Sequence, residues 1–295
     1  MNLSMSSRTR GSWARDAVAF AMLVLLSVSL GAQAEGPFPG PFESSAVGDT
    51  YDIRVHLPAS YDSEPDRTYP LVVTLDANYW FDESSSLSNG FKAAPGGLCE
   101  IADALVAADL VPEMILVGVG YPGEMMRARD YHGSPSLFFA FLRSELLPAL
   151  KAQYRVDDAS TVLLGHSSAA TFAVYAFLTA AIYQVDFFRH VVAVSGDYTR
   201  TENAVPELEA TLARRADAGL ASPAGSLYLG YGAQEESRFQ LPARELHGQL
   251  ESREYEQVEL RLTEFIGRDH GTVVRPAFRE ALRWILGDLS GDADE

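Results

Sequence analysis

The most constraining feature of this chain is a strand, a tight turn and a helix-forming segment that follow one another over residues 161–182. The strand part is Thr161-Val162-Leu163-Leu164, and the turn Gly165-His166-Ser167-Ser168-Ala169 has a Gly-x-Ser-x-small pattern. A serine on such a turn has a strained backbone that lifts its hydroxyl above the sheet edge and requires small neighbours. Gly165 and Ala169 are small, so Ser167 is the candidate nucleophile.

The same turn has a simpler interpretation. Ser167 precedes a helix, and serine is a common N-cap that satisfies free helix N–H groups. Ala169 also stands where the pattern prefers glycine. If Ser167 is the nucleophile, the N–H of Ser168 at the positive end of the helix dipole is a candidate oxyanion donor.

Segments typical of strands and helices alternate along the rest of the chain. Continuous apolar runs indicate strands that are covered on both faces. The alternation predicts an α/β fold, a mostly parallel central sheet with helices on both faces, and an active site at the carboxyl ends of the strands. The expected strands are 51–57, 71–75, 114–119, 161–164, 191–194, 226–229 and 258–265, and the expected helices are 98–108, 136–154, 169–182, 241–252 and 273–286. Residues 51–57 alternate apolar and polar side chains, which predicts an antiparallel edge strand.

The N-terminal segment has the features of a secretory signal peptide. Arg8, Arg10 and Arg15 precede an apolar run over residues 17–30, and Ala32-Gln33-Ala34 presents small residues where a signal peptidase cleaves. The run is shorter than the roughly 20 residues that span a bilayer. We therefore expect residues 1–34 to be a signal peptide, residues 35–295 to be a single domain, and the protein to be exported, either periplasmic or secreted, with no membrane span.

Charge and cysteine content restrict the partners. The net charge is −17, and removing three Arg and one Asp with the signal peptide makes it −19. Such acidity argues against nucleic acid and anionic membranes as partners. Cys99 is the sole cysteine, so the chain forms no internal disulfide.

A serine nucleophile needs a base, and His270 is the best candidate among six histidines. It follows the last expected strand in Phe265-Ile266-Gly267-Arg268-Asp269-His270, 103 positions after Ser167. The order serine, acid, histidine is that of α/β-hydrolases. A solvated or helix-capping role is the alternative for His270. His56 and His247 lie on polar faces, and His190 lies at the opposite end of the sheet. His166 lies inside the turn and points away from Ser167, and His132 lies in a loop over a strand end.

Several carboxylates compete for the third position of a triad. The acid orients the imidazole and stabilises its charged form. Glu235, after the strand at 226–229, is the first candidate and Glu236 the second, and Asp197, after the strand at 191–194, is their rival. Asp269 fits a solvated turn residue. A Ser-His dyad without an acid is a further alternative.

The loop after residues 71–75 is expected to supply the second oxyanion donor. The N–H of Asn78 is the candidate, beside Ala77, and the aromatic residues 79–81 line a pocket or pack in the core. Arg127 and Arg129 lie over another strand end. They are candidates to meet an anionic substrate group, although an ion pair of Arg129 with Asp130 is the commoner arrangement.

Four blocks resemble the α/β-hydrolase esterases grouped with the enterobactin-trilactone (siderophore) esterases and the wider esterase-D-like superfamily. They are residues 69–78, residues 117–122 with Arg129-Asp130-Tyr131, the turn at Ser167, and Asp269-His270-Gly271-Thr272-Val273-Val274. The chain departs from the family at Asp76-Ala77, where relatives have Asp-Gly, and at Ala169-Ala170, where they have glycines. Relatives also have Ser-Pro-Ser-aromatic where this chain has Ser195-Gly196-Asp197-Tyr198, which favours Asp197 as a substitute acid or substrate contact.

The resemblance implies a carboxylic-ester hydrolase with Ser167 as nucleophile and His270 as base, without metal or organic cofactor. Its substrate would be a small-molecule ester, either a siderophore-type lactone or a small acyl ester. Two alternatives remain open from the sequence: a catalytically silent α/β-hydrolase-fold binding protein, and an acyltransferase that uses the same residues.

Overall fold

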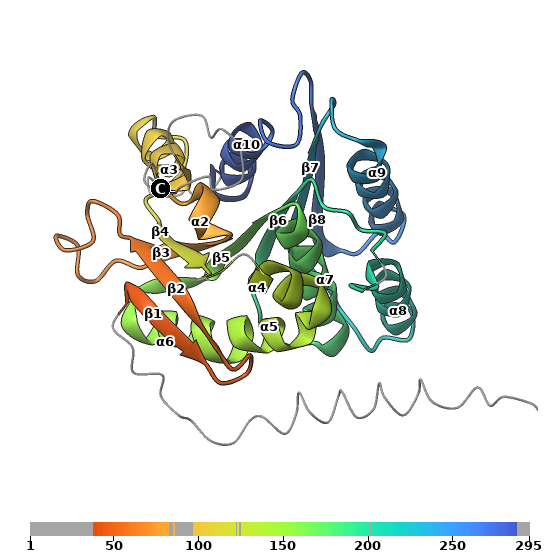
Figure 1. Cartoon of the computed structure of the whole chain (residues 1–295), viewed down its shortest axis with the longest axis horizontal. Coiled ribbons are helices and arrows are strands. Elements are labelled where there is room, and N and C mark those ends of the chain that lie inside the picture. The colour runs from red at the N-terminus through yellow and green to blue at the C-terminus, as the bar shows by residue number, and fades with distance from the viewer. Residues whose placement is uncertain are drawn as a thin grey trace, which may run out of the picture. The chain divides into compact units, whose positions relative to one another are not determined.

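An eight-stranded sheet forms the centre of the protein (Figure 1). The structure is a computed structural model and describes residues 38–82, 85, 97–121, 123, 125–200 and 202–287. The strand order is β1-β2-β4-β3-β5-β6-β7-β8. The pairs β1–β2 and β2–β4 are antiparallel and all pairs from β4 to β8 are parallel. The strands are β1 (Gly40–Ser44), β2 (Asp49–His56), β3 (Tyr69–Leu75), β4 (Ile115–Gly120), β5 (Val156–His166), β6 (His190–Val194), β7 (Ala224–Gly232) and β8 (Gln257–Phe265). The predicted α/β fold with a mostly parallel sheet is confirmed.

Helices cover both faces of the sheet, and each face has its own core. Along β5, Leu163 packs into one core while Val162 and Leu164 pack into the other, because successive side chains point to opposite faces. The first core includes side chains of α5 to α9, and the second includes those of α2, α3 and α10. The helical elements are α2 (Ala77–Trp80), α3 (Leu98–Ala107), α4 (Met125–Ala128), the π-helical η1 (Arg129–Gly133), α5 (Pro135–Phe141), the π-helical η2 (Leu142–Leu146), α6 (Leu147–Gln153), α7 (Ser168–Tyr183), α8 (Val205–Asp217), α9 (Ser237–Glu251) and α10 (Val274–Leu286).

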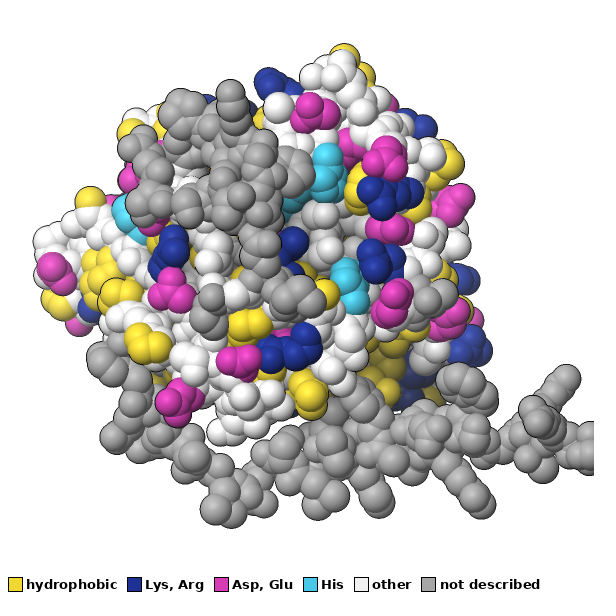
Figure 2. All heavy atoms as spheres, viewed as in Figure 1, with side chains coloured by type: hydrophobic (Ala, Val, Ile, Leu, Met, Phe, Trp, Pro, Cys, Tyr) yellow, Lys and Arg dark blue, Asp and Glu magenta, His cyan; other side chains and the backbone are white. Residues whose placement is uncertain are grey.

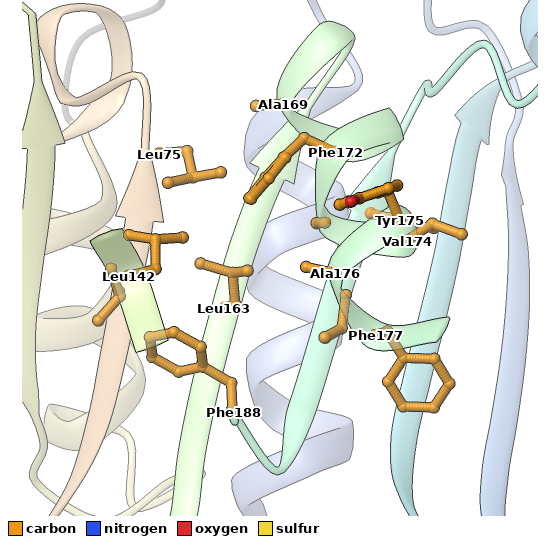
Figure 3. Close-up of a cluster of buried hydrophobic side chains, with 14 of the residues drawn as sticks. Leu75, Leu142, Leu163, Ala169, Phe172, Val174, Tyr175, Ala176, Phe177 and Phe188 are labelled. Carbon is orange, nitrogen blue, oxygen red and sulfur yellow. The ribbon is translucent and has the colours of Figure 1, made fainter. Parts of the chain in front are cut away.

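Helix α7, which begins directly after the candidate nucleophile, is buried along most of its length. Figure 3 shows Phe172 and Ala176 of this helix beside Leu163 of β5, with Leu75 of β3 and Leu142 of η2 on the other side of the cluster. A helix that is apolar nearly all round must be covered by neighbours rather than face water. This packing anchors the turn before α7 to the interior of the protein.

The structure corrects the expected edge strand and adds helical elements that were not expected. Residues 51–57 were expected at the edge, but β1 pairs with β2 and occupies that edge instead. Pro41 is tolerated there because an edge strand leaves one side of its backbone unpaired. Helix α8, between β6 and β7, has no counterpart among the helices expected from the sequence, and neither do the short elements α2, α4 and η1 in segments expected to be loops. The remaining expected strands and helices are present, most of them with ends shifted by a few residues.

The predicted signal peptide, residues 1–34, lies outside the described residues. Within the described part of the chain, no helix is long and apolar enough to cross a membrane. On the face shown in Figure 2, acidic and basic side chains are interspersed and hydrophobic side chains are scattered.

Candidate active site

Ser167 lies on a strained turn between β5 and α7. Its φ of 60° and ψ of −123° are rare for a non-glycine residue, as the sequence pattern predicted. A Cβ on Gly165 would lie 2.5 Å from the carbonyl oxygen of Ala169, so only glycine fits there. The N–H of Ser167 donates to the carbonyl of Val194 at 2.8 Å, which ties the turn to β6.

Ser167, His270 and Glu235 form a hydrogen-bonded series. His270 Nε2 is 3.0 Å from Ser167 Oγ, and His270 Nδ1 is 2.8 Å from Glu235 Oε1. A carboxylate only accepts hydrogen bonds, so Nδ1–H donates to Glu235 and Nε2 is left to accept from the Ser167 hydroxyl. The imidazole is thereby in the tautomer that a general base requires.

The acid loop and the histidine loop brace each other. The N–H of Gln234 donates to the carbonyl of Arg268 at 2.9 Å, and the Gly232 N–H donates to Glu235 Oε2 at 3.0 Å. The Glu235 side chain is fully buried. The ring of Phe239, at the start of α9, stacks on His270 with centroids 4.3 Å apart. Glu235 and Phe239 therefore fix the imidazole from its edge and from its face.

The rival acids have other partners. Asp197 lines the same pocket, and its carboxylate accepts from the Thr199 hydroxyl at 2.7 Å. Glu236 is exposed and pairs with Arg238 at 3.2 Å. Asp269 caps its own turn through Thr272, and these hydrogen bonds lower the pKa of its carboxyl. Of these carboxylates, Glu235 is the one hydrogen-bonded to the imidazole.

The expected oxyanion loop is held from two sides. Asp76, just before α2, has a left-handed φ of 60° and is buried, and Arg127 binds its carboxylate through two contacts of 2.7 Å. The Tyr131 hydroxyl also donates to Asp76, at 3.0 Å. The Asn78 side chain donates to the carbonyl of Tyr121 at 2.9 Å and accepts from its N–H at 2.7 Å. The backbone N–H groups of Asn78 and Ser168 both lie in the first turn of a helix, where no intrahelical acceptor is available.

Comparisons with known proteins identify related esterases. Residues 44–289 match the family model described as "Putative esterase". The chain belongs to this family of esterases. The ferri-bacillibactin esterase BesA of Bacillus subtilis (strain 168) is 24% identical over 269 residues, which cover 80% of this chain and 85% of that protein.

Solved structures show the same fold. The BES protein from Bacillus cereus superposes with a TM-score of 0.68 at 23% identity, over 88% of this chain and 98% of that one. The siderophore hydrolase EstA from Aspergillus nidulans gives 0.68 at 19% identity, over 86% and 93%. The enterobactin esterase FES from Shigella flexneri gives 0.62 at 19% identity, over 86% of this chain and 61% of that one. The suspected resemblance and the carboxylic-ester hydrolase class are confirmed.

The esterase has an open pocket of about 510 Å³ at the nucleophile, with both polar and apolar surface in its lining. Ser167 and His270 line it together with Arg200, Arg238 and Asp197. Its volume falls within the range of small-molecule sites. Among the residues that the structure describes, no group of three or more His, Cys, Asp or Glu side chains is placed to hold a metal.

The two arginines expected near substrate are engaged elsewhere. Arg127 holds Asp76, and Arg129 pairs with Asp130 at 2.6 Å and with Asp49 at 2.7 Å. Arg127 therefore holds the residue before α2, and Arg129 ties η1 to β2. The described residues that line the pocket of this esterase include two other arginines, Arg200 and Arg238.

His166 is a site residue that the sequence interpretation set aside. It was expected to point away from Ser167, and its Nε2 lies 2.9 Å from the carbonyl oxygen of His270. The two rings lie 4.6 Å apart between centroids, and Trp80 packs edge-on against His166 at 5.5 Å. The strand pattern predicts that the side chains of His166 and Ser167 point in opposite directions, but it carries no information about the loop that contacts His166.

Proposed function

We propose that this esterase is an exported serine hydrolase that cleaves carboxylic esters of small molecules through an acyl-enzyme on Ser167. The observation that carries the proposal is the series of hydrogen bonds from Ser167 through His270 to Glu235, of 3.0 and 2.8 Å. The strained turn under Ser167 and the family membership support the same assignment.

In the proposed reaction, His270 Nε2 takes the hydroxyl proton while Ser167 Oγ attacks the ester carbonyl carbon. Glu235 stabilises the imidazolium that forms. The backbone N–H groups of Ser168 and Asn78 donate to the oxyanion of the tetrahedral intermediate. Collapse expels the alcohol, which receives the proton from His270. Water then attacks the acyl-enzyme in the same way and releases the acid.

The proposed substrate class is a siderophore-type lactone or a small acyl ester. A relative and several structural neighbours carry names that refer to siderophore hydrolysis, which supports the lactone. The open pocket supports a substrate with polar groups, because Arg200 and Arg238 lie at the nucleophile. Turnover of p-nitrophenyl acyl esters compared with a trilactone siderophore ranks the two classes, and an added alcohol separates hydrolysis from acyl transfer.

A fluorophosphonate probe tests the mechanism directly. We expect the probe to label the purified wild-type protein, and we expect Ser167→Ala and His270→Ala to abolish labelling and ester turnover. Ser195→Ala is the matched control, since this buried serine directly follows the neighbouring strand β6 and its hydroxyl has no hydrogen-bond partner among the described residues. A wild-type protein that neither reacts with the probe nor turns over any ester would identify a catalytically silent binding protein.

Export is proposed from the sequence of residues 1–34 alone. N-terminal sequencing of the protein recovered outside the cytoplasm should begin at Glu35. A retained apolar run would contradict cleavage.

A further inference from the structure

His166 is buried directly under the candidate base. Its side chain lies at the end of β5 against the ring of Trp80, and 6% of the residue is exposed. Its Nε2 lies 2.9 Å from the carbonyl oxygen of His270. A carbonyl only accepts, so His166 Nε2 carries the proton and donates it to the backbone of His270.

The surroundings of His166 keep its ring neutral. Burial, and after it the neighbouring charge of His270, lower the pKa of His166 well below its ordinary value, and Arg127 acts in the same direction. The hydrogen bond to the His270 carbonyl opposes this shift without reversing it. The Nε2 proton of His166 is committed to the His270 carbonyl, and the imidazole nitrogen within hydrogen-bond distance of Ser167 Oγ is His270 Nε2.

The contacts of His270 then divide between its side chain and its backbone. Glu235 and Phe239 fix the imidazole, at 2.8 Å to Nδ1 and 4.3 Å between ring centroids. His166 fixes the main chain that carries the imidazole. A misplacement of about 1 Å at a reacting group can cost about 10²-fold in rate, so the position of this main chain matters to catalysis.

We infer that His166 is a positioning residue for the base, which acts through its Nε2–H hydrogen bond to the His270 carbonyl. The inference rests on the proposed function, in which His270 is the base of an esterase. Because His166 is adjacent to Ser167, the end of β5 holds the nucleophile on one side and the base loop on the other.

Two kinds of substitution separate the hydrogen bond from the packing. His166→Phe keeps a ring but removes the donor, whereas His166→Gln keeps an N–H donor at a similar distance from the backbone. We expect kcat to fall by about 10- to 100-fold in His166→Phe with KM within about twofold of the wild type. We expect His166→Gln to stay within about threefold of the wild-type kcat. His166→Met is a smaller variant without a donor for the case in which the phenylalanine variant does not fold.

His190→Phe is the matched control. His190 is a partly buried histidine at the start of the neighbouring strand β6, at the end of the sheet away from Ser167. Its ring is hydrogen-bonded to the Ser226 hydroxyl at 3.0 Å. Because His190 does not lie at the site, the same exchange there should leave kcat within about twofold of the wild type. Circular dichroism and thermal melting of all variants confirm that differences in kcat do not follow from unfolding.

Proton NMR supplies a readout that does not depend on turnover. The wild type and His166→Gln should share the low-field resonance of the His270 Nδ1 proton bound to Glu235, and in His166→Phe it should shift or broaden. If the wild type is active and the phenylalanine and methionine variants match its kcat, or if glutamine loses as much as phenylalanine, the positioning role is refuted while the esterase mechanism stands. A wild type that reacts with neither probe nor ester refutes the proposed function itself.

Discussion

Replacing Glu235 by glutamine should disable the esterase without disturbing its shape. Both contacts of the Glu235 carboxylate come from donors, namely the His270 Nδ1–H at 2.8 Å and the Gly232 N–H at 3.0 Å. A glutamine amide has one accepting atom and one donating group in the same positions. One of the two native donors must therefore face the NH₂ group.

The glutamine amide has two possible orientations in this buried site. If the amide oxygen stays on His270, the Gly232 N–H faces another donor at a buried position, which costs about 1 to 3 kcal/mol. If the oxygen turns to Gly232, the NH₂ group donates to Nδ1 and the imidazole changes tautomer, so that both contacts are satisfied. His270 then carries its proton on Nε2 and cannot accept one from Ser167.

We expect Glu235→Gln to lower kcat by about 10⁴-fold, the loss known for the equivalent change in a serine-protease triad. That factor corresponds to about 5 kcal/mol of lost transition-state stabilisation. The assay is the turnover of a p-nitrophenyl acyl ester, with kcat and KM measured separately, and KM should change little. Urea unfolding of the same variant checks that the fold is retained.

Two neighbours provide the controls. Glu236→Gln makes the same chemical change one residue later, on an exposed side chain paired with Arg238, and should stay within about twofold of the wild type. Asp197→Asn should also cost far less than Glu235→Gln. Glu235→Gln with more than about a tenth of the wild-type kcat would refute the assignment, and a larger loss in Asp197→Asn would move the acid to Asp197.

Three further predictions concern stability and reactivity. The free energy of unfolding should fall as the pH drops below about 6.5, by at most about 4 kcal/mol per pH unit. Burial lowers the pKa of three histidines in the folded protein, so as the pH drops these histidines bind protons in the unfolded chain before they do so in the folded one. These histidines are His132, His166 and His190. Urea unfolding at pH 7.5, 6.5 and 5.5 measures this slope, and equal stability at all three would contradict it. Burial raises the pKa of Cys99 to about 12, so a thiol reagent at pH 8 should leave the folded protein unmodified and react after unfolding. Gly165→Ala should destabilise the protein by about 1 to 3 kcal/mol, since the added Cβ would lie 2.5 Å from the Ala169 carbonyl oxygen. Gly248→Ala in α9 is the control, because its Cβ would meet nothing within 4 Å, and it should stabilise the protein by about 0.5 to 1 kcal/mol.

The elements that the sequence predicts are those whose own residues determine them. The apolar runs of β3 to β7 are buried on both faces, and this pattern identifies a strand without knowledge of its neighbours. β1 is different, because a short segment containing Pro41 forms a strand only through its pairing with β2. Helix α8 has buried positions at helical spacing, but one of them is Glu209, whose charge interrupts the apolar pattern. Arg253, after α9, pairs with Glu209 at 2.8 Å and makes this burial possible.

The residues of the candidate site also differ in how far the local sequence determines them. Ser167 and His270 follow from local sequence, since the turn and the chain order each restrict where they lie. Glu235 could be ranked above Asp197 and Glu236 but not separated from them, because the choice depends on which carboxylate the folded loops bring within 3 Å of the imidazole. The strand rule does predict that His166 and Ser167 leave β5 on opposite sides.

What the strand rule does not predict is that the loop between β8 and α10 lies across the end of β5. There the loop presents the His270 side chain to Ser167, at 3.0 Å, and the His270 carbonyl to His166, at 2.9 Å. Two consecutive residues of one strand end thus contact the same histidine, one through its ring and one through its backbone. The hydrogen bond from His166 therefore links the main chain of the base to the strand end that precedes the nucleophile.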